Sequence, residues 1–337
     1  MIADLMMSNR LTKHWPTLVG MVLAGAFLFF AFRNVDLNGL LLQFQRIGWI
    51  ETGITAALAL TTLLLRGLRW WYLLPRPLKK GELWASVRAI SLGYGVTNVA
   101  SRLGEVVRIL SLRHGTGRDF GSITATVVLD RLLLDMLVFA GLVGYSLLVF
   151  RDRILALFPA AETALFAMSA AILVGLVGLF WLGLAPTSFK RLLRWFRIDR
   201  LTWLWRRLEP LIDQISTGLA VLSNPLNYAV LAVINTATWG AAVVLLWYVM
   251  EVFGVSASLP EAVMMFTVSN LGMILPSPGG IGTYHYFTKL GLTQLLGVEP
   301  VTGAALVTFA HGVSYLATSG AAVGAYFVKP SVPEPES

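Results

Sequence analysis

Residues 226–253 read LNYAVLAVINTATWGAAVVLLWYVMEVF, a stretch with a single charged side chain, Glu251. It exceeds the ~20 apolar residues that cross a hydrocarbon core as a helix, and comparable runs occupy residues 163–185 and 303–328. Only 13% of the 337 residues are charged and 56% are apolar, so the charged fraction is roughly half the usual one. The sequence therefore excludes a soluble fold and predicts an all-α polytopic membrane protein.

The net charge of +8 is concentrated in short basic stretches between the apolar runs. In a soluble protein it would indicate a nucleic-acid partner, but here we expect none, because cations that flank membrane spans set the topology. Two stretches are predicted to be cytoplasmic, one at the end of the second span and one at 187–207. Their cations are Arg66, Arg69, Arg76, Lys79, Lys80, Lys190, Arg191, Arg194, Arg197, Arg200, Arg206 and Arg207.

The two basic stretches are interpreted differently with respect to the membrane. Arg66 and Arg69 are interpreted as interfacial residues, with Arg66 the deeper of the two. The stretch at 187–207 alternates cations with leucine and tryptophan, which is typical of a helix that lies on anionic headgroups. Gathering of substrate is the alternative role of that stretch.

Counting spans from the cytoplasmic segments gives one membrane domain over residues 1–337. About six full transmembrane helices are expected, with two re-entrant helical hairpins in an inverted repeat. The predicted parts are a signal-anchor helix and juxtamembrane segment (1–48), a first repeat (49–185) with a hairpin at 85–118, a basic amphipathic cytoplasmic connection (186–225), a second repeat (226–329) with a hairpin at 259–297, and a disordered tail (330–337). Both termini are then cytoplasmic, and the chain is assigned to the bacterial cytoplasmic membrane.

The two predicted hairpins share an outline. Val96-Thr97-Asn98 precedes a turn at Gly104-Glu105, and Val268-Ser269-Asn270 precedes a turn at Gly279-Gly280. The first hairpin enters from the cytoplasm and the second from outside. This is a recurring transporter design, because helix ends and unwound backbone form a polar site away from lipid. Chance similarity between glycine-rich membrane segments is the alternative.

Charges within the membrane cost about 2.5–3.5 kcal/mol each on insertion scales, so they require a partner or a function. Asp130, Arg131 and Asp135 lie within the third span, and i,i+4 spacing lets Arg131 pair with Asp135. This pair either serves the function or only stabilises helix packing. Asp130 is left to meet Arg102 or Arg108 from the first hairpin.

The first hairpin places Arg102, Glu105 and Arg108 at i,i+3,i+6 spacing, on roughly one helical stripe. Two guanidinium groups with a carboxylate between them suit bidentate recognition of a phosphate, with Glu105 holding one arginine in place. Ordinary snorkelling cations at a cytoplasmic turn are the alternative.

The second hairpin turns at Pro276-Ser277-Pro278-Gly279-Gly280-Ile281-Gly282. The prolines end one half-helix, and the glycines allow a tight turn that exposes N–H groups to an anion at the next helix N-terminus. A purely structural tip is the alternative. His285 and His311 add titratable side chains, each either a substrate contact or a hydrogen-bonded packing residue.

The sequence contains no enzyme constellation that we recognise. Walker, HExxH and GxSxG motifs are absent. Without cysteine there is neither a disulfide framework nor a thiolate metal site. We therefore predict no catalytic residue, no metal site and no cofactor.

Three motifs taken together resemble a known family. They are Asn98-x3-Arg102-Leu103-Gly104-Glu105-x2-Arg108, Val127-Val128-Leu129-Asp130-Arg131-Leu132-Leu133-Leu134-Asp135 and Leu275-Pro276-Ser277-Pro278-Gly279-Gly280-Ile281-Gly282. In this order and spacing they resemble the flippase-like membrane domain of lysylphosphatidylglycerol synthases, a family that also includes stand-alone bacterial, archaeal and hopanoid-associated membrane proteins. The resemblance implies two repeats with re-entrant helices and movement of a phosphate-bearing lipid between leaflets.

The chain departs from this family at three positions. His285 stands where the family commonly has a carboxylate, His311 stands where it often has arginine, and the usual proline before the first Gly-Glu is absent, with Ser101 nearby. The two histidines are expected to alter the preferred headgroup or to make the site pH-sensitive. The aminoacyl-transfer domain of full-length synthases is also missing, so we do not expect this chain to make lysyl-lipid.

The leading hypothesis is a flippase or scramblase, not an enzyme, that moves an anionic phospholipid or a polyprenyl-phosphate-linked lipid. Its predicted substrate-binding residues are Asn98, Arg102, Glu105, Arg108, Asp130, Arg131, Asp135, Asn270, Pro278, Gly279, Gly280, Gly282, His285 and His311. Two alternatives are an intramembrane enzyme that acts on a lipid phosphate and a non-transporting scaffold of a lipid or cell-envelope synthesis complex. Besides lipids, the partners considered are a second copy of the chain and a lipid-modifying enzyme.

Overall fold

The computed structural model describes residues 18–100, 103–157, 185–219 and 225–328, with scattered positions between 159 and 181. These residues form helices and no strand, which confirms the all-α class. In chain order the helices are Leu18–Phe32, α2 (Leu37–Gln45), α3 (Trp49–Leu73), α4 (Glu82–Val99), α5 (Leu103–Thr116), α6 (Phe120–Val128), η1 (Leu129–Asp135), α7 (Met136–Leu157), α9 (Pro186–Trp195), η2 (Ile198–Arg200), α10 (Thr202–Leu219), α11 (Pro225–Val252), α12 (Leu259–Ile274), η4 (Pro278–Gly280), α13 (Thr283–Leu295) and α14 (Pro300–Phe327).

Several helices are long and apolar enough to cross a membrane. Within the described residues they are Trp49–Leu73, Phe120–Ala156, Leu226–Val252 and Pro300–Phe327. They coincide with four of the predicted spans and confirm a polytopic membrane protein. The predicted first span is the helix Leu18–Phe32, which is bent by 85° relative to α2. The predicted span at 163–185 lies partly outside the described residues.

The side chains are distributed as in a protein surrounded by lipid. Large apolar residues cover the outside of the spans, where Trp49 is 91% and Leu148 is 87% exposed. By contrast, the charged residues Arg69 and Asp130 are buried. Exposed apolar surface is unfavourable in water and favourable in hydrocarbon, so this distribution agrees with a membrane environment.

The hairpin predicted at 85–118 is formed by α4 and α5, which pack along each other. Gly93 permits the close approach, because a Cβ there would lie 3.0 Å from the carbonyl oxygen of Gly104. The turn predicted at Gly104-Glu105 is wrong: α4 ends at Val99, and both residues lie in the first turn of α5. The carboxylate of Glu105 is therefore held by a helix rather than by a loop.

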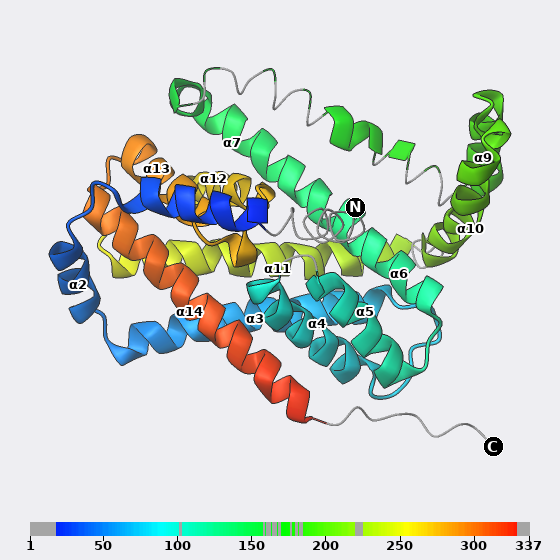
Figure 1. Ribbon diagram of the computed structural model, residues 1–337, viewed down its shortest axis with the longest axis horizontal. Helices are drawn as coiled ribbons and strands as arrows, with labels where there is room; N and C mark the ends of the chain where they lie inside the picture. Colours follow the sequence, from blue (N-terminus) through cyan, green and yellow to red (C-terminus); the bar gives the residue numbers. More distant parts are fainter. Residues whose placement is uncertain are drawn as a thin grey trace, which may run out of the picture.

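The hairpin predicted at 259–297 is formed by α12 and α13, with η4 in the turn between them. The two hairpins point toward each other from opposite ends of the molecule, with α4 and α5 on the right of Figure 1 and α12 and α13 on the left. Their tips meet where Gly279 packs against the carbonyl oxygen of Asn98. Asn98 also donates to Ser319 of α14 at 2.9 Å. Hairpins that enter from opposite ends are the arrangement expected of an inverted repeat.

The connection predicted at 186–225 contains two amphipathic helices, α9 and α10, rather than a single one. They are separated by a turn in which Arg197 has a φ of 60°. The Lys190 ammonium of α9 lies 2.7 Å from the Asp213 carboxylate of α10, so the helices lie against each other at one end of the molecule (Figure 1). Trp195 and Trp203 are exposed, as expected for helices at a membrane surface.

Candidate functional site

The described charges that were predicted at membrane depth come together in one cluster, which also includes Arg66 and Arg69. Two arginines come from α3, an arginine and a glutamate from α5, and the remaining three residues from η1. These residues are Arg66, Arg69, Glu105, Arg108, Asp130, Arg131 and Asp135. Arg102, which was also predicted to belong here, lies outside the described residues. Folding of three separate segments therefore assembles the cluster.

Arg69 lies at the centre of the cluster and is fully buried. Its Nη2 is 2.7 Å from Asp130 Oδ1 and 2.8 Å from Asp135 Oδ1, while its Nη1 donates to Asn235 Oδ1 of α11 at 2.5 Å. The interpretation of Arg69 as an interfacial residue is therefore wrong. Hydropathy places it near the end of an apolar run, but the last turns of α3 are covered by other helices whose acidic residues the run itself does not reveal.

Arg108 is the second buried arginine of the cluster. Its Nη2 donates to Asp130 Oδ2 at 3.2 Å, which confirms one of the two partners predicted for Asp130. Its Nε is 2.8 Å from Glu105 Oε2, as expected if Glu105 holds this arginine in place. The guanidinium also lies over the Trp70 ring, 4.7 Å from its centroid. Arg108 therefore contacts a carboxylate of its own helix α5, a carboxylate of η1 and an aromatic ring of α3.

Arg131 forms the predicted i,i+4 pair and one more contact. Its Nη1 donates to Asp135 Oδ2 at 2.8 Å, and its Nε and Nη2 donate to Glu105 Oε1 at 3.0 and 2.6 Å. The side chains of Arg131 and Glu105 are 35% and 38% exposed. These two residues form the accessible edge of the cluster.

The backbone of η1 explains why two carboxylates reach one arginine. In an α-helix, Asp130 and Asp135 would lie about 140° apart around the axis. The segment is a π-helix instead, and its i to i+5 hydrogen bonds bring residues five apart toward one face, so both carboxylates reach Arg69. Asn235 supports this turn by donating from Nδ2 to the Leu134 carbonyl at 3.3 Å. Neither the π-helix nor the role of Asn235 was predicted from the sequence.

Arg66 is held less tightly than the other arginines. Its Nη1 lies 3.7 Å from Asp135 Oδ2, and its guanidinium carbon lies 5.7 and 5.8 Å from the ring centroids of Tyr94 and Trp239. The cluster contains four arginines and three carboxylates, so one positive charge is in excess. Since Arg66 has the weakest carboxylate contact, we assign the excess charge to it.

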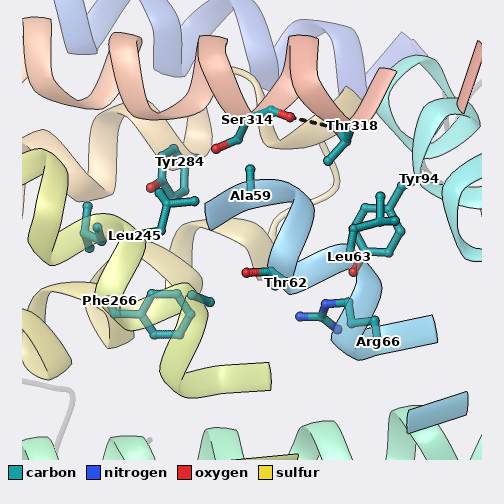
Figure 2. A pocket seen from close by; sticks show the side chains of 12 residues that line it. Ala59, Thr62, Leu63, Arg66, Tyr94, Leu245, Phe266, Tyr284, Ser314 and Thr318 are labelled. Atoms are coloured by element: carbon teal, nitrogen blue, oxygen red, sulfur yellow. Dashed lines mark hydrogen bonds between the residues drawn. The ribbon is translucent and has the colours of Figure 1, made fainter. Parts of the chain in front are cut away.

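Arg66 also lines a cavity of about 200 Å³ that lies between α3, α4, α11, α12, α13 and α14. Figure 2 shows Arg66 and Tyr94 on one side of this cavity and Tyr284 on the other. Along α3 the lining extends from Ala59 to Arg66, about 10 Å at 1.5 Å per residue. Thr62, Ser314 and Thr318 add hydroxyl groups to the wall. A partly polar space thus extends from the charged cluster toward the second hairpin.

The turn of the second hairpin is closely packed. Gly279 and Gly282 have φ values of 56° and 84°, a backbone region that favours glycine. A Cβ on Gly282 would collide with the carbonyl oxygen of Ala24, and one on Gly279 would press against that of Asn98. Because carbonyl oxygens repel anions, these contacts favour the structural role of the turn over the predicted anion site.

Among the described residues, three other predicted residues of the second hairpin form no hydrogen bond or ion pair with the cluster. Pro278 and Gly280 bound η4. The Asn270 side chain donates back to the carbonyl oxygen of Phe266 on its own helix at 2.8 Å. The structure therefore brings the charged residues of the first half together and leaves these three apart from them.

His285 and His311 lie next to each other, with ring centroids 4.9 Å apart. His285 Nδ1 and His311 Nε2 are buried and have no hydrogen-bond partner among the described residues. Tyr284, on the cavity wall, lies 5.2 Å from His311 between ring centroids. The pair therefore lies beside the cavity.

The carboxylates of the cluster are occupied by arginines. In the part of the chain that the structure describes, no group of three or more histidine, aspartate or glutamate side chains is placed to hold a metal ion. The chemistry that this arrangement offers is recognition of an anion.

Fold and site define a polytopic helical membrane protein with ion-paired charges and a polar cavity inside its bundle of spans. Residues 17–322 match the family described as the lysylphosphatidylglycerol synthase TM region, and the chain belongs to this family, which confirms the resemblance. It is similar to a UPF0104 membrane protein of Methanothermobacter thermautotrophicus, with 24% identity over 293 residues that cover 83% of each chain. No solved structure matches the chain.

Proposed function

We propose that this protein moves a phosphate-bearing lipid, either a phospholipid or a polyprenyl-phosphate-linked lipid, between the leaflets of the bacterial cytoplasmic membrane. The observation that carries the proposal is the cavity of about 200 Å³ that begins at Arg66, beside a cluster with one excess positive charge. A headgroup that leaves water loses hydration, so it needs compensating contacts at membrane depth. An anionic headgroup beside Arg66 also balances the charge of the cluster.

The arginines divide into two roles. Arg66, on the cavity wall, and Arg131, at the accessible edge of the cluster, contact the phosphate. Arg69 and Arg108 are buried and orient the carboxylates that position the other two. This assignment differs from the sequence-based one, in which Arg108 was a phosphate ligand.

The cavity wall lowers the barrier to movement across the membrane. The hydroxyl groups of Tyr94 and Ser314 replace part of the water around the headgroup, whereas those of Thr62 and Thr318 donate to carbonyl oxygens of their own helices and offer only acceptors. The acyl or prenyl chain stays in the surrounding lipid. The chain has no ATP-binding motif, so transport is downhill or coupled to ions. We place both termini and the basic connection in the cytoplasm.

Reconstitution in liposomes tests the proposal. The wild-type protein is expected to accelerate the exposure of a fluorescent phospholipid or polyprenyl phosphate to an aqueous quencher. Arg66→Gln is expected to slow exchange about tenfold or more, because a hydrogen bond to a charged group contributes about 1.5–3 kcal/mol. Arg66→Lys keeps the charge and is expected to retain intermediate exchange.

Arg153→Gln is the matched control, because Arg153 pairs with Glu261 at 3.1 Å and has a half-exposed side chain outside the cluster. Its exchange rate is expected to equal that of the wild type. If the protein accelerates exchange of none of several phospholipids and polyprenyl phosphates, the proposal is wrong. Normal exchange in a folded Arg66→Gln protein would instead remove Arg66 from the transport path.

The neighbouring histidines favour a second candidate, an intramembrane enzyme that acts on a lipid phosphate. His285 Nδ1 and His311 Nε2 have no partner among the described residues, so one ring is free to act as a base or nucleophile. Release of phosphate from a polyprenyl-phosphate substrate, lost in His285→Ala, would support this candidate. Absence of both phosphate release and lipid exchange would leave the scaffold hypothesis, with a lipid-modifying enzyme or a second copy of the chain as partner.

A further inference from the structure

A second cavity, of about 280 Å³, lies away from the charged cluster. Its lining includes residues at the end of the helix Leu18–Phe32, residues of α13, and Pro300 at the start of α14. In Figure 1 the end of α13 and the start of α14 lie on the left, whereas α5 and α6 lie on the right. The cavity therefore lies toward the end of the molecule predicted to face outward.

Two cations line this cavity, Arg33 and Lys289, and no acidic residue does. Lys289 Nζ donates to the carbonyl oxygen of Ala31 at 2.6 Å, and the Arg33 guanidinium lies over the Phe30 ring, 5.5 Å from its centroid. Neither cation forms an ion pair within the described residues. An ammonium has three N–H donors and a guanidinium five, so most of their donors are available to a ligand.

Among the described residues, the buried cations have partners within the protein, whereas Arg33 is exposed and Lys289 is half-buried. The buried arginines of the cluster contact carboxylates, and Arg118 lies 2.6 Å from Glu82. Arg88 donates to the carbonyl oxygens of Ala325 and Val328. Topology does not explain Arg33 and Lys289, because the positive-inside bias places cations on the cytoplasmic side. A bound anion would supply the missing partner.

The surroundings of the two cations indicate an amphipathic ligand. Asn34 and Thr293 add neutral donors to the cavity wall. Phe30 lines the cavity and Phe29 is next to it in sequence, and their side chains are 47% and 63% exposed. A polar recess that adjoins exposed aromatic surface suits a molecule with an anionic head and an apolar tail.

We propose that this cavity binds the headgroup of an anionic phospholipid that stays with the protein and is not transported. The phosphate lies between the Arg33 guanidinium and the Lys289 ammonium, where both form charge-assisted hydrogen bonds with its oxygens. The acyl chains lie along Phe29 and Phe30. Since different helices supply the two cations, the bound lipid ties the helix Leu18–Phe32 to α13 and stabilises the folded state by mass action.

This site is independent of the proposed transport function. It shares no lining residue with the cavity beside Arg66. The group that the two cations would bind is a singly charged phosphate, which a lipid headgroup or a small soluble phosphate ester could supply. The experiment therefore includes both sources.

Thermal unfolding of delipidated protein in neutral detergent tests the proposal. Phosphatidylglycerol added to the micelles is expected to raise the unfolding midpoint by about 3–5 °C. Phosphatidylcholine and glycerol phosphate are expected to have no effect. The phosphatidylglycerol shift is expected to disappear in Arg33→Gln and in Lys289→Gln, and to persist in Arg46→Gln, which changes an exposed arginine just after α2.

Several results would contradict the proposal. An equal shift with phosphatidylcholine would remove the charge requirement, and a shift with glycerol phosphate alone would show that no lipid is needed. An undiminished shift in Arg33→Gln would exclude this cavity; that variant decides the test if Lys289→Gln fails to fold after losing its bond to Ala31. Leaflet exchange is measured separately, so its absence would count against the transport proposal and not against this site.

Discussion

At the scale of residues, Arg66 and Arg69 show how position within one helix separates structure from function. They lie three residues apart on α3 and share a face, displaced by about one turn. Arg69 is buried between two carboxylates at 2.7 and 2.8 Å, whereas Arg66 is 3.7 Å from the nearest carboxylate and borders the cavity. Substitution of the first is therefore expected to affect stability, and substitution of the second to affect ligand binding.

Arg69→Gln is expected to lower the free energy of unfolding by about 3–5 kcal/mol, because it leaves Asp130 and Asp135 without their central partner in a buried site. The measurement is the unfolding midpoint in detergent, compared with Arg66→Gln, which is expected to stay near the wild type. A folded Arg69→Gln protein of wild-type stability would contradict the structural role.

The site was only partly predictable from sequence at this scale. The contacts of Arg131 with Asp135 and of Arg108 with Asp130 followed from helical spacing and from the rule that buried charges need partners. Arg69 was missed because its partners are distant in sequence. Hydropathy describes one segment at a time, so it could not show which acids the end of α3 would face.

At the scale of elements, the π-helix η1 could not be predicted, because contacts with other helices determine it and its own sequence does not. Its sequence, Leu-Asp-Arg-Leu-Leu-Leu-Asp, contains no proline or glycine that would interrupt α-helical geometry. Arg69 and Asn235 from other helices bind its side chains and a backbone carbonyl, and these contacts favour the wider turn. The second hairpin, by contrast, was predictable because Pro276, Pro278 and the glycines that follow fix where its helices end. The turn of the first hairpin, which has no proline or glycine between Val99 and Leu103, was misplaced.

The turn of the second hairpin gives a prediction at this scale. Gly282→Ala is expected to destabilise the protein through an unfavourable φ, at about 1–2 kcal/mol, and through collision with the Ala24 carbonyl oxygen, at about 1–3 kcal/mol more. Gly117→Ala is the control, because its φ is also positive, at 65°, with nothing within 4 Å of the added Cβ. Unfolding midpoints in detergent compare the two variants. Equal losses would show that the contact with the helix Leu18–Phe32 contributes nothing.

At the scale of the whole molecule, the two hairpins are opposed. The open end of the first hairpin lies at one end of the bundle, and the open end of the second lies at the other. α4 begins and α5 ends on the right of Figure 1, whereas α12 begins and α13 ends on the left. The sequence predicted this arrangement from the distribution of basic residues, because cations accumulate on the cytoplasmic side. It could not predict that the hairpin tips touch, since the contact of Gly279 with Asn98 depends on packing between distant segments.

The absence of cysteine from the chain makes this topology directly testable. Single Lys80→Cys and Arg113→Cys variants place a thiol at exposed positions near the ends of the first hairpin, and Ser256→Cys and Glu299→Cys do so near the ends of the second. In intact bacterial spheroplasts, an impermeant maleimide is expected to label the second pair and not the first. Permeabilisation is expected to make the first pair reactive, which controls for burial. Labelling of all four in intact spheroplasts would contradict the inverted arrangement on which the transport proposal depends, because both hairpins would then enter from the same leaflet. Labelling of only the first pair would keep the inverted arrangement and would contradict the cytoplasmic placement of the termini.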